Sequence, residues 1–282
     1  MSERAPASRD SGARPPGAWM RLVPTLVALV WLAPAAASEV PSADVVILGE
    51  VHDNAAHHLW QAETVVALQP SAIVFEMLLP EQAAAATPEL RPHAEALEAA
   101  LQWEAQGWPD FTMYHPIFIA APGAEIVAGN VPRDDVRAAM SDGAAEVFAA
   151  AFEADPAAFG LDTPLDRDEQ HAREALQATA HCDALPETLL PGMVEAQRLR
   201  DAALALAALQ AHAEHGGPVV VITGTGHART DWGVPAMLAL AAPGLEVFAV
   251  GQLESDPGPG APFDLLRVTD PAPRDDPCAA FH

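Results

Sequence analysis

The strongest constraint on the fold is a run of aliphatic residues that ends abruptly in polar ones, at Val45–Asn54. Four consecutive aliphatic residues after a Pro/Ser turn are typical of a strand buried in a parallel sheet. Glu50 and His52 then lie at the carboxyl end of this strand, where ligands bind in open α/β sheets. A second run, Val219–Gly224, ends in the same Gly-x-x-His pattern, and its histidine is His227.

The remaining pattern predicts an α/β fold, with a mostly parallel sheet and helices on both faces, because strands alternate with helices. The predicted strands are Asp44–Gly49, Ala72–Glu76, Glu125–Asn130, Val219–Gly224, Leu245–Gly251 and Phe263–Thr269. The predicted helices include Ala55–Leu68, Pro92–Gln106, Val194–His215 and Val234–Ala241.

The chain is expected to divide into four parts. Residues 1–37 form a signal peptide, and residues 38–131 and 191–270 form the α/β domain. Residues 132–190 have helical spacing and no strand pattern, so we expect a helical insertion or small helical domain there. Residues 271–282 form a Pro-rich tail, expected to be loosely ordered unless Cys278 holds it.

The first residues have the three regions of a secretory signal. Four arginines precede or begin the apolar run Leu22–Leu32, and the small residues that follow predict cleavage after Ala37. The run is short for a membrane span. We therefore expect a periplasmic or secreted protein, with no stable membrane anchor.

Two further features of the composition bear on the environment of the protein. The formal net charge is −25, which argues against binding to nucleic acid or to an anionic membrane surface. Cys182 and Cys278 are the two cysteines of the chain. In an oxidising compartment such a pair predicts a disulfide.

The strand ends supply most of the candidate site residues. Glu50 and His52 follow the first strand, Glu76 ends the second, and His227 follows the fourth. Two histidines and two carboxylates suit either a divalent metal or an acid–base centre. Other polar residues there have structural interpretations: Asp53 is expected to cap the next helix, and His57 and His58 are expected to be solvated.

Tyr114, the single tyrosine, lies in an apolar and aromatic helix beside His115. On sequence alone we favour ordinary core packing with a satisfied hydroxyl. Tyrosinate is also one of the few side chains that ligate haem iron, so this alternative is kept.

Taken together, these motifs resemble the ChaN family of haem-binding uptake proteins, in the superfamily of the Tiki proteases and erythromycin esterases. They follow one another in order from about residue 44 to residue 240. The matching segments are Leu48–Asn54 with His57 and His58, Phe75–Met77, the helix around Tyr114, Gly129–Arg133, Ala196–Asp201, Gly224–Arg229 and Trp232–Pro235.

The resemblance implies a periplasmic haem-binding protein used in haem or iron uptake, with a parallel α/β domain and a smaller helical domain. It implies a homodimer that encloses haem, with Tyr114 as iron ligand and a histidine nearby. The histidines proposed for the cofactor site are His52, His115 and His227, and Arg133 and Arg229 are proposed to pair with the haem propionates. ChaN itself is a lipoprotein, and this chain lacks the lipid-bearing cysteine.

The alternative function is a metal-dependent or histidine-based hydrolase of the Tiki or erythromycin esterase type. The resemblance then makes His52, Glu76 and His227 the catalytic residues. In the metal-dependent form, Glu50 joins these three as a ligand, and the metal activates water. In the other form His52 is a general base.

Overall fold

The computed structural model describes residues 12, 39–276, 278 and 279, and the account below concerns the unit Ser38–His282. The predicted signal peptide lies outside the described residues. The predicted α/β fold is confirmed: six parallel strands form one sheet in the order β3-β2-β4-β1-β5-β6. The strands are β1 (Val45–Glu50), β2 (Ala72–Phe75), β3 (Glu125–Ala128), β4 (Val219–Gly224), β5 (Val247–Leu253) and β6 (Leu265–Val268).

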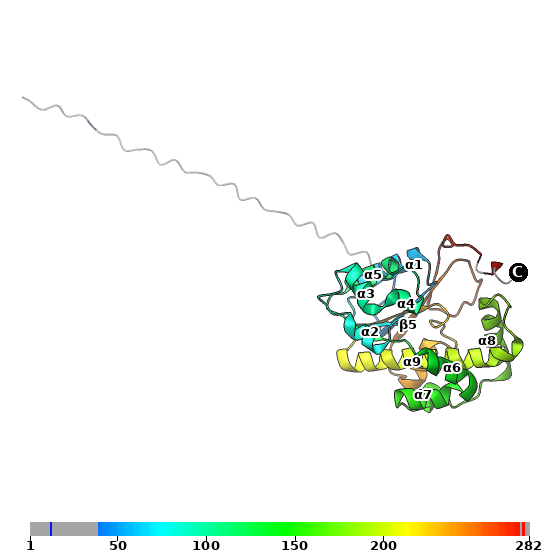
Figure 1. Ribbon diagram of the computed structural model, residues 1–282. Helices are drawn as coiled ribbons and strands as arrows, with labels where there is room; N and C mark the ends of the chain where they lie inside the picture. The colour runs from blue at the N-terminus through cyan, green and yellow to red at the C-terminus, as the bar shows by residue number, and fades with distance from the viewer. Residues whose placement is uncertain (1–11, 13–38, 277, 280–282) are drawn as a thin grey trace, which may run out of the picture. The chain divides into compact units, whose positions relative to one another are not determined.

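The helices lie on both faces of the sheet, as predicted (Figure 1). They are α1 (Ala55–Leu68), α2 (Pro80–Ala85), α3 (Ala94–Leu101), α4 (Trp103–Gln106), α5 (Phe111–Ala120), α6 (Arg133–Asp142), α7 (Ala144–Phe152), α8 (Arg167–Ala180), α9 (Leu190–His215) and α10 (Val234–Ala241). Two short 3₁₀ helices, Pro156–Phe159 and Glu187–Leu189, also occur in the described part of the chain.

The sheet is buried on both faces because alternate side chains of each strand point to opposite sides. In β1, Val45 and Ile47 join a core formed with α7, α9 and α10. Val46 and Leu48 join a second core, formed with α1, α3 and α5. This explains why the central strands have continuous rather than alternating hydrophobic sequences.

Local differences from the prediction have identifiable causes. The predicted helix over Pro92–Gln106 is two helices, because Gln102 adopts a left-handed conformation with φ 49°. The cap of α1 is Asn54, whose side chain accepts a hydrogen bond from the Ala56 N–H, and not Asp53. Asp53 pairs with Arg274 instead, at 2.7 Å.

The segment between residues 132 and 190 is helical, and no strand occurs in it among the described residues. It contributes α6, α7 and α8, which pack on α9. Phe148 and Phe159 lie in the same core as strand residues. This helical segment therefore forms one wall of the molecule on the α9 side of the sheet (Figure 1).

The C-terminal tail is held at two points. Arg274 forms ion pairs with Asp53 and Glu254, which lie beside the β1–α1 loop and after β5. Farther along, Cys278 forms the predicted disulfide with Cys182, just after α8, with a Cα–Cα distance of 5.4 Å. The tail therefore connects the β1–α1 loop with α8.

None of the helices in the described part of the chain combines the length and apolar character that a membrane span requires.

Candidate functional site

The predicted strand-end residues meet at one edge of the sheet. β1 and β2 flank β4, so their carboxyl ends open side by side. His52, Glu76 and His227 line a single cavity at this edge. Glu50 lies beneath them and is only 2% exposed. The structure thus brings His52, Glu76 and His227 into one cavity, as inferred from the parallel strand topology, whereas Glu50 does not line it.

Two glycines let these segments approach one another. A Cβ atom on Gly224 would lie 3.0 Å from His52 Nε2, tighter than ordinary packing. A Cβ atom on Gly49 would lie 2.9 Å from the backbone of Thr225 and from the side chain of Ala228. Larger residues at either position would push the β4 loop away from the β1 end.

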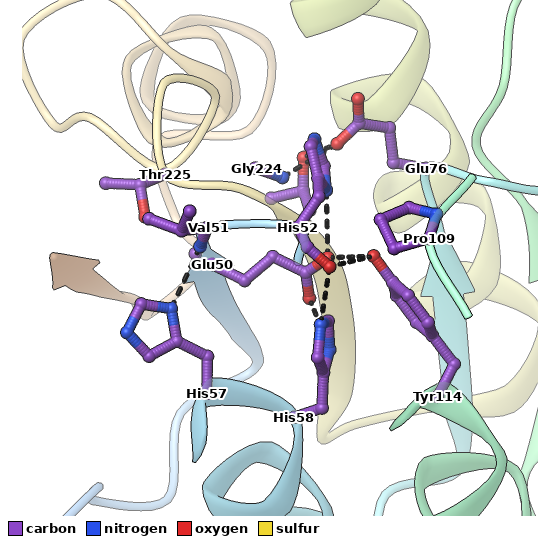
Figure 2. A network of polar contacts seen from close by, with 12 residues as sticks. Glu50, Val51, His52, His57, His58, Glu76, Pro109, Tyr114, Gly224 and Thr225 are labelled. Atoms are coloured by element: carbon purple, nitrogen blue, oxygen red, sulfur yellow. Dashed lines mark hydrogen bonds and ion pairs between the residues drawn. The ribbon is translucent and has the colours of Figure 1, made fainter. Parts of the chain in front are cut away.

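Glu50 is the centre of a buried polar network (Figure 2). Its Oε1 accepts hydrogen bonds from the Tyr114 hydroxyl at 2.6 Å and from His52 Nδ1 at 2.9 Å. Its Oε2 lies 3.3 Å from His58 Nδ1. Burial opposes ionisation of Glu50, but the interactions with His52 and His58 outweigh it and lower the pKa to about 2. Glu50 is therefore a carboxylate at neutral pH.

The contacts of His58 favour a doubly protonated ring. Its Nε2 lies 2.8 Å from the backbone carbonyl of His52, which only accepts, so Nε2 carries a proton. Its Nδ1 lies 3.3 Å from Glu50 Oε2, within ion-pair distance but without a hydrogen bond. Although burial lowers the pKa of His58, the interactions with Glu50 outweigh it and raise the pKa above its usual value. Glu50 and His58 therefore form a buried ion pair.

His57 and His58 are both fully buried, so the expectation that they are solvated was wrong. His57 Nδ1 accepts the Val51 N–H at 2.9 Å, and Nε2 contacts the Thr269 hydroxyl at 2.8 Å. Burial lowers the pKa of His57 to about 4, which keeps this ring neutral. His57 therefore anchors the loop after β1 to the segment after β6.

A second ionic network surrounds His227. Its Nδ1 lies 2.6 Å from Asp201 Oδ1, and its Nε2 lies 3.4 Å from Glu76 Oε1. The other oxygen of Glu76 accepts hydrogen bonds from the Thr223 hydroxyl and the Gly224 N–H, each at 2.7 Å. Burial alone would lower the pKa of His227, but the charges of Glu76 and Asp201 raise it to about 10.

The raised pKa of His227 predicts a loss of stability at alkaline pH. Its stabilising contribution is complete below the ordinary pKa of 6.5 and is lost as the pH rises through about 10. We expect the free energy of unfolding, measured with urea, to fall across this window. In His227→Gln the free energy of unfolding should change less with pH in this window. In His171→Gln, a change at an exposed position on α8, its pH dependence should be the same as in wild type. An unchanged slope in His227→Gln would contradict this assignment.

The cavity above the two networks has a volume of about 840 Å³. Its lining combines many polar and charged side chains with aromatic and aliphatic ones, the latter including Trp108, Trp232, Met193, Leu79 and Phe263. His52 reaches it from below, with 35% of its side chain exposed. The volume lies within the range of roughly 300–1,000 Å³ that is usual for small-molecule sites.

The two ring nitrogen atoms of His52 differ: one is hydrogen-bonded to Glu50, and the other is on the side of the cavity. Nδ1 contacts Glu50, whereas Nε2 has no hydrogen bond among the described residues. Burial lowers the pKa of His52, but the hydrogen bond that His52 donates to Glu50 and the charge of Glu76 raise it above the usual value. Such a histidine can exchange a proton or offer Nε2 to a metal. Its role as a general base stays a prediction.

Tyr114 and His115, both predicted for the cofactor site, are not among the described residues that line the cavity. Tyr114 is 0% exposed, and its hydroxyl donates to Glu50 beneath the cavity rather than lining it. Burial and the charge of Glu50 raise the pKa of this phenol well above its usual value. His115 points another way, because successive helical residues are about 100° apart. Its Nε2 donates to the Arg91 carbonyl at 2.8 Å. Ligation of iron by Tyr114 stays a prediction.

The two predicted arginines both line the cavity. The guanidinium of Arg229 is already bound by the Asp231 carboxylate and lies 3.9 Å from the Trp232 ring centre. Arg133 donates to the Gln106 carbonyl and has no carboxylate partner among the described residues.

The alternative of a metal ion held by Glu50, His52, Glu76 and His227 finds no support in the geometry. In the described part of the chain, no three His, Cys, Asp or Glu side chains are placed to hold a metal ion. The physical reason is that both carboxylates are already engaged. Glu50 is bound by Tyr114 and two histidines, and Glu76 by Thr223, Gly224 and His227.

One residue of this site was missed by the sequence reasoning. Asp201, on α9, is 0% exposed and binds His227. The available signal was a carboxylate within an Ala- and Leu-rich stretch of a long helix, since buried carboxylates are rare unless they are paired.

These features define a class: a parallel α/β protein with a ligand cavity at the carboxyl edge of its sheet. The chain belongs to the family described as haem-binding uptake, Tiki superfamily, ChaN, which it matches over residues 36–238. The resemblance inferred from the motifs is therefore confirmed.

Two solved structures are similar to this chain at low sequence identity, and the first shares its fold. The ChaN protein of Campylobacter jejuni, described with cofacially bound haem, is 18% identical, with a TM-score of 0.56; the match covers 77% of this chain and 83% of that one. The type III effector HopBA1 is 13% identical, with a TM-score of 0.44, over 81% of this chain and 88% of that one. No curated protein sequence matches the chain.

Proposed function

We propose that this protein binds haem in the cavity at the carboxyl edge of the sheet. The observation that carries the proposal is family membership together with a cavity of about 840 Å³ whose lining contains both aromatic rings and four arginines. Haem has the same division of properties: a flat apolar macrocycle and a charged edge with two carboxylates.

Within this cavity, His52 fits the iron. Histidines that ligate metals usually donate their second ring N–H to a carboxylate, which fixes the tautomer and makes the ligand more basic. His52 has this arrangement, with Nδ1 on Glu50 and Nε2 at the cavity. Tyr114 offers a second route, in which the phenol first leaves Glu50. Bound haem would supply its iron as the centre that these ligands hold.

Titration of the purified protein with ferric haem tests the proposal. We expect a saturable Soret band in the wild-type protein and a changed spectrum with weaker binding in His52→Ala. Binding should strengthen as the pH rises through the pKa of His52, because a protonated Nε2 does not ligate iron. Tyr114→Phe keeps the aromatic ring but removes the hydroxyl, so it is the matched variant that tests ligation of the iron by Tyr114.

The two variants separate the possible ligands. An altered spectrum in Tyr114→Phe with no change in His52→Ala would assign the iron to Tyr114 and contradict the assignment to His52. A wild-type protein without a saturable Soret band would overturn haem binding itself.

We also propose that the protein acts in haem or iron uptake in the periplasm, as a homodimer. The N-terminal sequence and the family description support this extension. Intact mass of protein exported by its own signal should correspond to cleavage after Ala37, and sedimentation should give twice the mature mass. Retention of the N-terminal apolar run would refute the predicted cleavage. A monomer both with and without haem would refute the homodimer.

A further inference from the structure

The charge of the cavity lining is opposite to that of the protein as a whole. The chain has a formal net charge of −25, yet Glu76 is the only carboxylate among the described residues that line the cavity. Since Glu76 is held by His227 and two hydrogen bonds, its charge is largely compensated. The cationic lining residues are Arg133, Arg173, Arg200 and Arg229.

Two of these arginines lie on neighbouring helices, Arg173 on α8 and Arg200 on α9. Neither was given a role from the sequence, although Arg200 lies within the matching segment Ala196–Asp201. On α8, Arg173, Gln177 and Ala180 are spaced by four and three residues, so they share the face that lines the cavity. On α9, Met193, Gln197 and Arg200 show the same spacing and also line the cavity. Because α8 packs on α9, the two faces form one surface.

Arg173 carries an unsatisfied donor. The residue is 8% exposed, and its Nε donates to Glu169 Oε1 at 2.9 Å. Its Nη2 also contacts Glu169, while Nη1 is buried without a hydrogen-bond partner. The guanidinium also lies 5.1 Å from the Trp232 ring centre. Buried donors in native proteins are nearly always satisfied, so Nη1 is a donor to which a ligand in the cavity can supply the acceptor once the side chain turns toward it.

Arg200 is free of ionic partners. It is half-buried at the cavity wall, and no hydrogen bond or ion pair joins it to another described residue. Arg198, two residues earlier, shows the opposite: it binds Glu195 and three backbone carbonyls. An arginine that stabilised the fold would be placed like Arg198, whereas Arg200 presents an unused guanidinium to the cavity.

We propose that Arg173 and Arg200 form the anion-recognition wall of this cavity and bind the carboxylates of an amphipathic dicarboxylate ligand. The proposal rests on the proposed function, since it assigns the residues that hold the charged edge of a porphyrin. Planar guanidinium groups match carboxylates in geometry and charge, and such pairs are among the stronger hydrogen bonds in proteins. Recognition therefore does not require iron.

An iron-free ligand tests the wall separately from iron ligation. Protoporphyrin IX has two free carboxylates, and its dimethyl ester has the same ring without charge. The binding of each, followed by porphyrin fluorescence and by quenching of tryptophan fluorescence, should show a preference of about tenfold or more for the diacid. Arg200→Gln and Arg173→Gln should each weaken diacid binding by about tenfold and leave ester binding unchanged.

Control variants separate recognition from folding. Arg200→Lys keeps the positive charge and should retain part of the preference for the diacid. Arg137→Gln removes an exposed arginine of α6, which pairs with Asp134, and should bind like wild type. Thermal unfolding of each variant checks that the loss of the Glu169 contact in Arg173→Gln does not unfold the protein.

Equal affinity of the wild-type protein for diacid and ester, or an undiminished preference in both glutamine variants, would overturn the proposal. If ferric haem still binds in that case, the proposal of haem binding stands and only the proposed role of Arg173 and Arg200 is refuted. Absence of saturable binding of haem and of both porphyrins would overturn both proposals together.

Discussion

Replacing Glu50 with alanine is expected to lower the free energy of unfolding by about 3–5 kcal/mol. The reason is that Glu50 is the counter-ion of His58, and both side chains have 0% exposure. Without the carboxylate, a buried imidazolium must remain uncompensated or lose a proton, and the Tyr114 hydroxyl keeps only its longer hydrogen bond, at 3.2 Å to the His52 carbonyl. Urea unfolding followed by circular dichroism measures the change, and thermal unfolding should show a decrease of roughly 6–20 °C.

Glu63→Ala is the matched control, because Glu63 is an exposed carboxylate on α1. The double variant Glu50→Leu, His58→Leu removes both charges and should cost less than the sum of the two single changes. A loss below about 1 kcal/mol in Glu50→Ala would show that the pair is not ionised as its geometry indicates.

Replacing both Cys182 and Cys278 with serine is expected to lower the free energy of unfolding by about 4–5 kcal/mol in the chain-entropy account. The disulfide joins residues 96 apart, so it restricts a long loop in the unfolded chain. Guanidinium unfolding of the variant and of the oxidised wild-type protein measures the difference. Reduced wild-type protein is the control and should behave like the variant.

A difference below about 1 kcal/mol would contradict the prediction, because it would mean that the tail and α8 separate before the remaining structure unfolds.

The sheet and the site edge were predictable because they follow from strong local patterns. Aliphatic runs such as Val45–Leu48 leave few alternatives to a buried strand, and parallel strands bring their carboxyl ends together. The convergence of His52, Glu76 and His227 is a consequence of that topology. The pairing of two cysteines required only their number and an oxidising compartment.

The buried polar networks were less predictable, because sequence patterns associate polar residues with solvent. His57 and His58 lie on the face of α1 that packs against the sheet, a position that apolar residues usually occupy. Their burial depends on Glu50, which lies just before α1 but joins it only when β1 enters the sheet, and on Thr269, which is 212 residues from His57. Asp201 was missed for the same reason, since its partner His227 lies 26 residues away.

Resemblance to a family identified the ligand class, but it placed Tyr114 by motif alone. The structure adds what the motif lacks: the orientation of each side chain on its helix. Tyr114 points toward the Glu50 carboxylate, His115 toward a carbonyl on the other side, and Arg200 toward the cavity.

The tail that joins the β1–α1 loop to α8 has a consequence for how this protein should be handled. Its two attachments are of different kinds: the ion pairs of Arg274 persist in any redox environment, whereas the bond between Cys182 and Cys278 requires oxidation. Protein made in a reducing cytoplasm would therefore keep the first attachment and lose the second. The helical segment that carries Arg173 would then be held by packing and by the hydrogen bonds of Arg198, without its covalent link to the tail, so ligand affinities should be compared on oxidised protein.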